Sequence, residues 1–68
     1  MRNTIKVERA KLNITQTDLA ERIKVSKQTI HSIETGRFVP STVIALKLAQ
    51  CFDVKVEDLF QLEPEDTS

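Results

Sequence analysis

Five hydrogen-bonding side chains lie close together in the segment Lys27-Gln28-Thr29-Ile30-His31-Ser32. The amide of Gln28 can donate one hydrogen bond and accept another, which matches the adenine edge in the major groove of DNA. The ammonium of Lys27 can reach guanine acceptors. Ser32 comes one helical turn after Gln28, and His31 could add a contact or simply be solvated. The segment predicts base contacts by Lys27, Gln28, Ser32 and His31; the alternative is a solvated helix start.

A second set of residues suits phosphate groups. Gln16 and Ser26 stand at expected helix N-termini, where unpaired backbone N–H groups and the helix dipole favour an anion. Arg37 follows the helix-ending Gly36, which makes it the best-placed cation, and Thr35 lies beside it. The predicted phosphate contacts are Gln16, Ser26, Thr29, Thr35 and Arg37.

Two short helices joined by a tight turn would carry these residues. Thr15 can cap a helix over residues 16–23, with Asp18 completing a weak capping box, and Ser26 can cap a helix over 27–35. Val25 can fill the turn between them. Apolar residues recur on one face of each helix, namely Leu19, Ala20 and Ile23, then Ile30 and Ile33. This pattern indicates a helix-turn-helix, which places side chains in the DNA major groove.

Apolar periodicity predicts three further helices, over about 4–12, 42–52 and 56–60. Asn13 and Gly36 suit left-handed exits from the first and third helices, and Ser41 can cap the fourth. Phe38, in the loop before that cap, is expected to pack into the core. The sequence therefore predicts an all-α, five-helix domain over residues 1–62, followed by a solvated acidic tail at 63–68.

The order of these fragments resembles the Cro and phage-repressor (XRE-type) helix-turn-helix family over residues 5–60. The fragments that carry the resemblance are Ile5-Lys6 with Arg9, Thr15-Gln16, Leu19-Ala20-Glu21, Val25 to Ile30, Ile33-Glu34 with Gly36, Pro40-Ser41, Ala45 to Ala49 with Phe52, and Val56 to Phe60. The Phe60-Gln61 ending looks like small stand-alone members such as the cytolysin-repressor type. The resemblance implies a lambda-repressor-like fold and a DNA-binding regulator. In such a regulator, the first turn of the third helix enters the DNA groove most deeply.

The resemblance also implies an ion pair between Arg9 and Glu34 that fixes the third helix against the first. Three residues depart from the family pattern. Lys24 stands where glycine is usual in the turn, Glu8 replaces a common apolar residue, and Lys55 replaces the Ser or Thr cap of the last helix. These departures concern local stability more than the outward face of the third helix.

Charge is divided unevenly along a chain whose formal net charge is zero. Residues 1–37 carry eight Lys and Arg against four Asp and Glu, whereas residues 38–68 carry two against six. A basic half around the helix-turn-helix suits attraction to phosphates. The alternative is a chance division of a highly charged surface.

The sequence supports neither an enzyme nor a membrane protein. His31 and Cys51, the only residues of their types, have no carboxylate placed to orient them, and Cys51 is expected to be a core residue. Glycine-rich loops and metal-ligand spacings are missing. No run of about 18 apolar residues is present. We therefore expect a cytoplasmic protein without catalytic residues, metal, other cofactors or a small-molecule ligand.

The fourth helix carries more apolar surface than one core face can take up. Val43 and Leu46 form a second stripe on it. Leu62 could extend this patch or form a short strand at the chain end. The patch predicts a homodimer interface of Val43, Leu46 and Leu62, unless these are isolated exposed aliphatics.

Together these features predict a homodimeric repressor that binds double-stranded DNA at a palindromic operator. Two alternatives stay open: an antitoxin or phage-immunity component that binds its own operator, and a protein-interaction module using the same fold. The sequence leaves open which operator and which genes are involved, and whether regulation is negative or positive.

Overall fold

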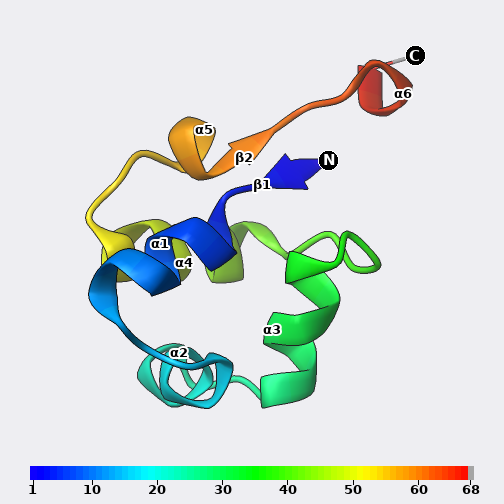
Figure 1. The fold of residues 1–68 in the computed structure, drawn as a ribbon. Helices are drawn as coiled ribbons and strands as arrows, with labels where there is room; N and C mark the ends of the chain where they lie inside the picture. Colours follow the sequence, from blue (N-terminus) through cyan, green and yellow to red (C-terminus); the bar gives the residue numbers. More distant parts are fainter. Residues whose placement is uncertain (68) are drawn as a thin grey trace.

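The computed structural model describes residues 1–67, which form helices around a small apolar core with a two-stranded sheet at one side (Figure 1). The elements are β1 (Arg2–Asn3), α1 (Ile5–Leu12), α2 (Gln16–Ile23), α3 (Lys27–Glu34), α4 (Thr42–Phe52), α5 (Val56–Leu59), β2 (Phe60–Gln61) and α6 (Pro64–Thr67). The five predicted helices are present, each within one residue of its expected ends. The predicted fold class is therefore confirmed.

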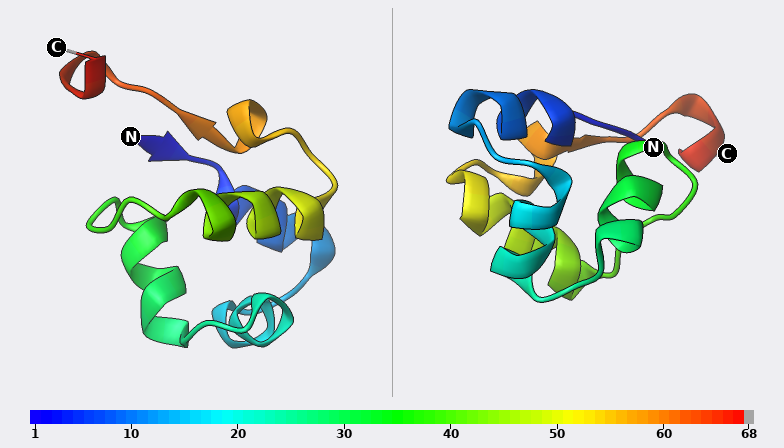
Figure 2. Two further views of the ribbon diagram at one scale, coloured as in Figure 1. Left: turned by 180° about the vertical axis from the view of Figure 1, so that it is seen from behind. Right: turned by 60° about the horizontal axis from the view of Figure 1, so that its bottom comes forward.

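The core is enclosed by α1 to α5 and β2, which all contribute buried side chains. In Figure 1, α2 and α3 lie below it and α5 with the sheet lies above, and the right-hand view of Figure 2 shows α1 and α4 on opposite sides. Six side chains in it are fully buried: Ile5, Leu19, Ile30, Ile33, Leu48 and Leu59. Val25, in the turn before α3, and Cys51 on α4 are half-buried and pack against this core, as expected. Each helix of the helix-turn-helix thus buries one face and leaves the other to solvent.

Side-chain caps begin three of the helices, as predicted. The Thr15 hydroxyl accepts the Asp18 backbone N–H at 3.0 Å, and the Asp18 carboxylate accepts the Thr15 N–H at 2.9 Å, which completes the capping box. The hydrogen bonds from Thr15 lower the pKa of Asp18. Ser26 and Ser41 cap α3 and α4, whereas Lys55 gives α5 no side-chain cap.

Left-handed residues end most of these helices. Asn13, Lys24 and Gly36 have φ of 55°, 60° and 78°, which confirms the predicted exits and shows that Lys24 adopts the conformation usually given to glycine. Asp53, with φ of 55°, ends α4 in the same way and was not anticipated. Asp and Asn enter this region more readily than Lys does.

The sheet joins the two ends of the chain. β1 and β2 are antiparallel, with Arg2 opposite Gln61 and Asn3 opposite Phe60. The strand considered at Leu62 therefore lies earlier, at β2, and Leu62 is exposed. β1 was not predicted.

The acidic segment after β2 folds into α6, and in it Glu63 is half-buried whereas Glu65 and Asp66 are exposed. The amino group of Met1 forms ion pairs with Glu63 at 3.2 Å and with Asp66 at 2.9 Å. The hydrogen bond to Asp66 is the main cause of a raised pKa of this amino group. Ser68, the last residue of the predicted tail, lies outside the described residues.

The prediction that Phe38 packs into the core is wrong, since 47% of this residue is exposed. The backbone after α3 turns sharply, because the Arg37 and Phe38 N–H groups both donate to the Ser32 carbonyl, at 2.9 and 3.2 Å. This turn carries the ring along the outer side of α3. The core is filled instead by residues of the helices and by Phe60 of β2.

Replacing Lys24 by glycine should raise the free energy of unfolding by about 0.5–1 kcal/mol. A left-handed conformation costs a residue with a Cβ about 1–2 kcal/mol, and the greater chain entropy of unfolded glycine offsets part of the gain. Urea unfolding followed by circular dichroism measures the change. Asn13→Gly is the control and should gain less; a loss of stability in Lys24→Gly would show that the Lys24 side chain itself stabilises the turn.

Candidate nucleic-acid interface

The outward face of α3 brings together the four predicted base-contacting residues. Successive helical residues are rotated by about 100°, so Gln28 points nearly opposite to the buried Ile30 and Ile33, and Ser32 lies at the side of this outward face. Lys27, Gln28 and His31 are exposed, and Ser32 is half-buried. The amide of Gln28 lies 3.5 Å from the Ser32 hydroxyl, so the two side chains share one polar patch.

The residues predicted to contact phosphates differ in how free their side chains are to do so. Arg37 is exposed and forms no ion pair with any described residue. The Thr35 hydroxyl donates back to the His31 carbonyl at 2.9 Å, so its proton is directed at the helix end and it is less suited to a phosphate. Ser26 and Thr29 bond each other at 2.8 Å.

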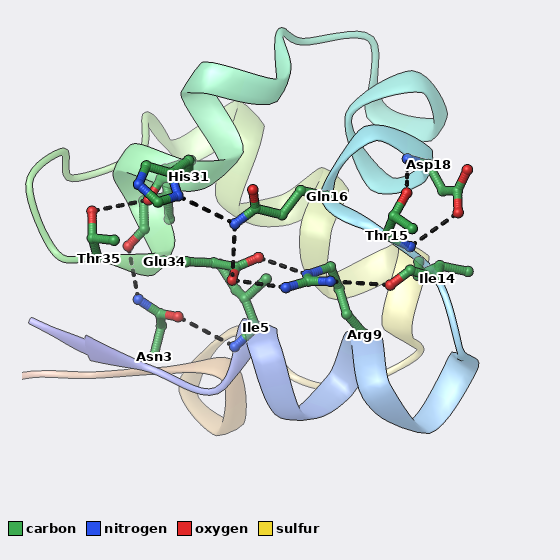
Figure 3. A network of polar contacts seen from close by, with 11 residues as sticks. Asn3, Ile5, Arg9, Ile14, Thr15, Gln16, Asp18, His31, Glu34 and Thr35 are labelled. Carbon is green, nitrogen blue, oxygen red and sulfur yellow. Dashed lines mark hydrogen bonds and ion pairs between the residues drawn. The ribbon is translucent and has the colours of Figure 1, made fainter.

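Gln16 is the first residue of α2, and its side chain turns toward α3 (Figure 3). Its amide nitrogen lies 3.4 Å from the Glu34 carboxylate and 3.4 Å from Nδ1 of His31. An open hollow of about 460 Å³ lies beside it, with Thr17 and Lys27 also in its wall. A helix N-terminus next to a lysine is a suitable place for a phosphate, and Thr17 was missed from the sequence.

The ion pair implied for Arg9 and Glu34 is confirmed, and it is bidentate (Figure 3). Nε of Arg9 donates to one carboxylate oxygen at 2.7 Å and Nη2 to the other at 3.1 Å. The two side chains are only 15% and 7% exposed. Nη1 donates to the Ile14 carbonyl at 3.1 Å, and the hydrogen bond to Glu34 raises the pKa of Arg9. One guanidinium therefore fixes α3 against both α1 and the loop before α2.

Asn3 holds the other end of α3 and was not identified from the sequence. Its amide donates to the Ile33 carbonyl at 2.9 Å, and its side-chain oxygen accepts the Ile5 N–H at 3.2 Å (Figure 3). The second bond satisfies the start of α1. An asparagine just before a helix is a known capping signal, so only this half of its role could have been found.

The structure also bears on two smaller points of the sequence analysis. Within residues 1–67, no helix is long and apolar enough to cross a membrane. Glu8, which departs from the family pattern, is half-buried and pairs with Lys11 at 3.1 Å.

Comparison with known proteins agrees with this geometry. The sequence profile of the helix-turn-helix family matches residues 5–59. The chain belongs to the Cro/C1-type helix-turn-helix family. An HTH-type transcriptional regulator of Methanocaldococcus jannaschii is 47% identical over 97% of this chain and 100% of its own length. The HTH-type transcriptional regulator YgzD of Bacillus subtilis is 42% identical over 97% and 100%.

A third relative, an HTH-type transcriptional regulator of Archaeoglobus fulgidus, is 44% identical over 97% of this chain and 93% of its own length. Bacterial and archaeal members of this DNA-binding family therefore match the chain over almost its whole length. The predicted family is confirmed.

Removing the carboxylate of Glu34 should destabilise the domain strongly. Glu34→Ala leaves the half-buried guanidinium of Arg9 without its partner. The cost should lie between about 1 kcal/mol for an exposed pair and about 3–5 kcal/mol for a fully buried one. Thermal unfolding followed by circular dichroism measures this loss. Because a domain of this size has only about 3–5 kcal/mol of stability, even an intermediate loss should lower the melting temperature clearly.

The pair between Glu8 and Lys11 supplies the matched control. Its lysine is exposed, so Lys11→Ala should cost less than about 1 kcal/mol. Equal losses for Lys11→Ala and Glu34→Ala would mean that burial of the Arg9–Glu34 pair has no energetic weight.

Proposed function

We propose that this protein is a homodimeric transcriptional repressor that binds a palindromic DNA operator through α3. The observation that carries the proposal is the outward face of α3, where polar side chains are exposed on a helix held by a half-buried ion pair. Membership of a DNA-binding regulator family, and relatives named as transcriptional regulators, support it.

Base recognition belongs to the first two turns of α3. Gln28 makes the paired contact with adenine, and Lys27 reaches guanine acceptors at the same end of the helix. Ser32 and His31 contact bases farther along the groove. His31 can also form a hydrogen bond with Gln16 through Nδ1.

Phosphate contacts flank the base contacts on both sides. The hollow of Gln16, Thr17 and Lys27 takes one phosphate, and Arg37 at the far end of α3 takes another. Ser26, Thr29 and Thr35 add weaker contacts. The excess of basic residues in the first half of the chain favours the same orientation on DNA.

The small contact area of one recognition helix favours a dimer. One recognition helix contacts too few base pairs for a specific site, and a two-fold pair doubles that number. Val43, Leu46 and Leu62 are 61%, 50% and 66% exposed, which is costly for large apolar side chains in water. Leu46 also borders an apolar hollow of about 250 Å³ with Val39 and Val56. We place the two-fold contact on this patch.

Selection of bound duplexes from a random pool tests the proposal. The expected result is an enriched palindrome whose half-sites lie about 10 base pairs apart, one turn of DNA. Enrichment of a single half-site would contradict the dimer. If no duplex binds at low salt, the chain is a protein-interaction module instead.

Gln28→Ala should weaken binding to the selected operator by about 1–3 kcal/mol per half-site and leave random duplexes nearly unaffected. The reason is the loss of a paired contact to one base edge. Fluorescence anisotropy with both kinds of duplex measures the difference. An equal loss on both would exclude Gln28 from base recognition.

Arg37→Ala is the contrasting control. It should lower affinity for all sequences alike and reduce the slope of log K against log salt by roughly one unit for each phosphate that Arg37 neutralises. An unchanged slope would place Arg37 away from the DNA.

Leu46→Glu should yield a folded monomer with little operator affinity. In a two-fold interface every substitution occurs twice, so the new carboxylates would face each other across the axis. Sedimentation equilibrium measures the oligomeric state. Val7→Glu, the same kind of change at an exposed valine on α1, should leave the dimer intact. A Leu46→Glu protein that remains dimeric would place the interface elsewhere.

A further inference from the structure

An open hollow of about 210 Å³ lies along one flank of α3. Gln28, Thr29 and Ser32 form its wall on the helix, and Phe38 closes it from the loop that follows. Gln28 and Ser32 belong to the proposed base-reading face, so the ring of Phe38 stands beside that face. The DNA contacts predicted from the sequence give this ring no role.

The backbone holds Phe38 in a fixed relation to α3. Its N–H and that of Arg37 both donate to the Ser32 carbonyl, and the Gly36 N–H donates to the Ile33 carbonyl at 3.1 Å. The loop is thus tied to the last turn of the recognition helix by three hydrogen bonds. Any movement of α3 into a groove would carry the ring with it.

Phe38 does not belong to the described core, and 47% of it is exposed. It also does not border the apolar hollow of the proposed dimer contact, which begins at the next residue, Val39. The loop therefore presents its two neighbouring apolar side chains to different surfaces: Val39 to the dimer hollow and Phe38 to the recognition helix.

The chemistry of the hollow limits what it can contact in a major groove. The apolar group that the bases expose there is the C5-methyl of thymine, which phenylalanine can contact. Gln28, on the same wall, suits adenine, and every adenine is paired with a thymine whose methyl lies in the same groove.

We propose that Phe38 is a specificity-determining residue that packs on the C5-methyl of a thymine at or next to the base pair that Gln28 contacts. This inference rests on the proposed function and deepens it. Gln28 alone distinguishes adenine by hydrogen bonds, and Phe38 adds a preference for thymine over cytosine or uracil at a neighbouring position.

Replacing single thymines of the selected operator by uracil tests this contact, because the change removes only a methyl group. For the thymine that Phe38 contacts, one replacement in one half-site should lower the wild-type affinity about fourfold relative to the unchanged operator. This is the value expected for burial of one carbon group. In Phe38→Ala that thymine and uracil should bind alike. Phe38→Leu, which keeps an apolar side chain, should retain most of the difference.

Two controls separate this role from others. Val39→Ala should preserve the full thymine preference, since Val39 borders the other hollow. Circular dichroism should show the same helicity for Phe38→Ala and wild type, as expected for a ring outside the core. The difference between the uracil effect in wild type and in Phe38→Ala then measures the energy of the contact itself.

A uracil effect of the same size in wild type and Phe38→Ala would overturn the inference, as would a wild-type scan in which no thymine matters. So would a Phe38→Ala protein that changes only the monomer–dimer equilibrium. These failures leave operator binding itself intact. Failure of the proposed function would be visible earlier, as the absence of any selected operator.

Discussion

The half-buried, bidentate pair of Arg9 and Glu34 is the interaction on which the presentation of α3 depends. Taking two charges out of water is costly, and two well-packed apolar side chains could hold α1 and α3 together at least as firmly. An apolar contact, however, tolerates sliding, whereas two parallel N–H···O bonds define one relative orientation. The third bond of the guanidinium, to the Ile14 carbonyl, adds the loop before α2 to the same arrangement. We infer that the pair sets the pitch of α3 at a cost in stability.

Other contacts hold α3 at its two ends. Ser26 caps its first turn, and Asn3 binds the Ile33 carbonyl in its last turn. Asn3 lies in β1, opposite Phe60 of β2, so its hydrogen bond connects the end of α3 to the sheet. Phe60 in turn borders the hollow beside the proposed dimer patch. A helix fixed in this way loses little freedom on binding, so more of its contact energy is available as affinity.

Local signals in the sequence predicted most of the fold. Thr15, Ser26 and Ser41 act within three residues of themselves, and the apolar periods of the helices are long enough to be read. Two-residue strands carry no periodicity, so β1 could not be predicted, and Asn3 acts on a residue thirty positions away. Phe38 was misplaced because hydrophobicity shows that a ring avoids water without showing which surface covers it. At the site, family resemblance supplied the ion pair, and only the structure revealed the loop geometry.

The division of charge has opposite consequences for the two surfaces of the proposed dimer. Residues 38–68 carry a net charge of −4, so two copies that meet through this half repel each other. Added salt screens that repulsion and favours the dimer, whereas it weakens the phosphate contacts of the basic half by counterion uptake. In the proposed function, operator binding includes both steps, because only a dimer would read two half-sites. The salt dependence measured on a full operator should therefore be shallower than the number of phosphate contacts implies, and it should steepen at protein concentrations where the dimer is already complete.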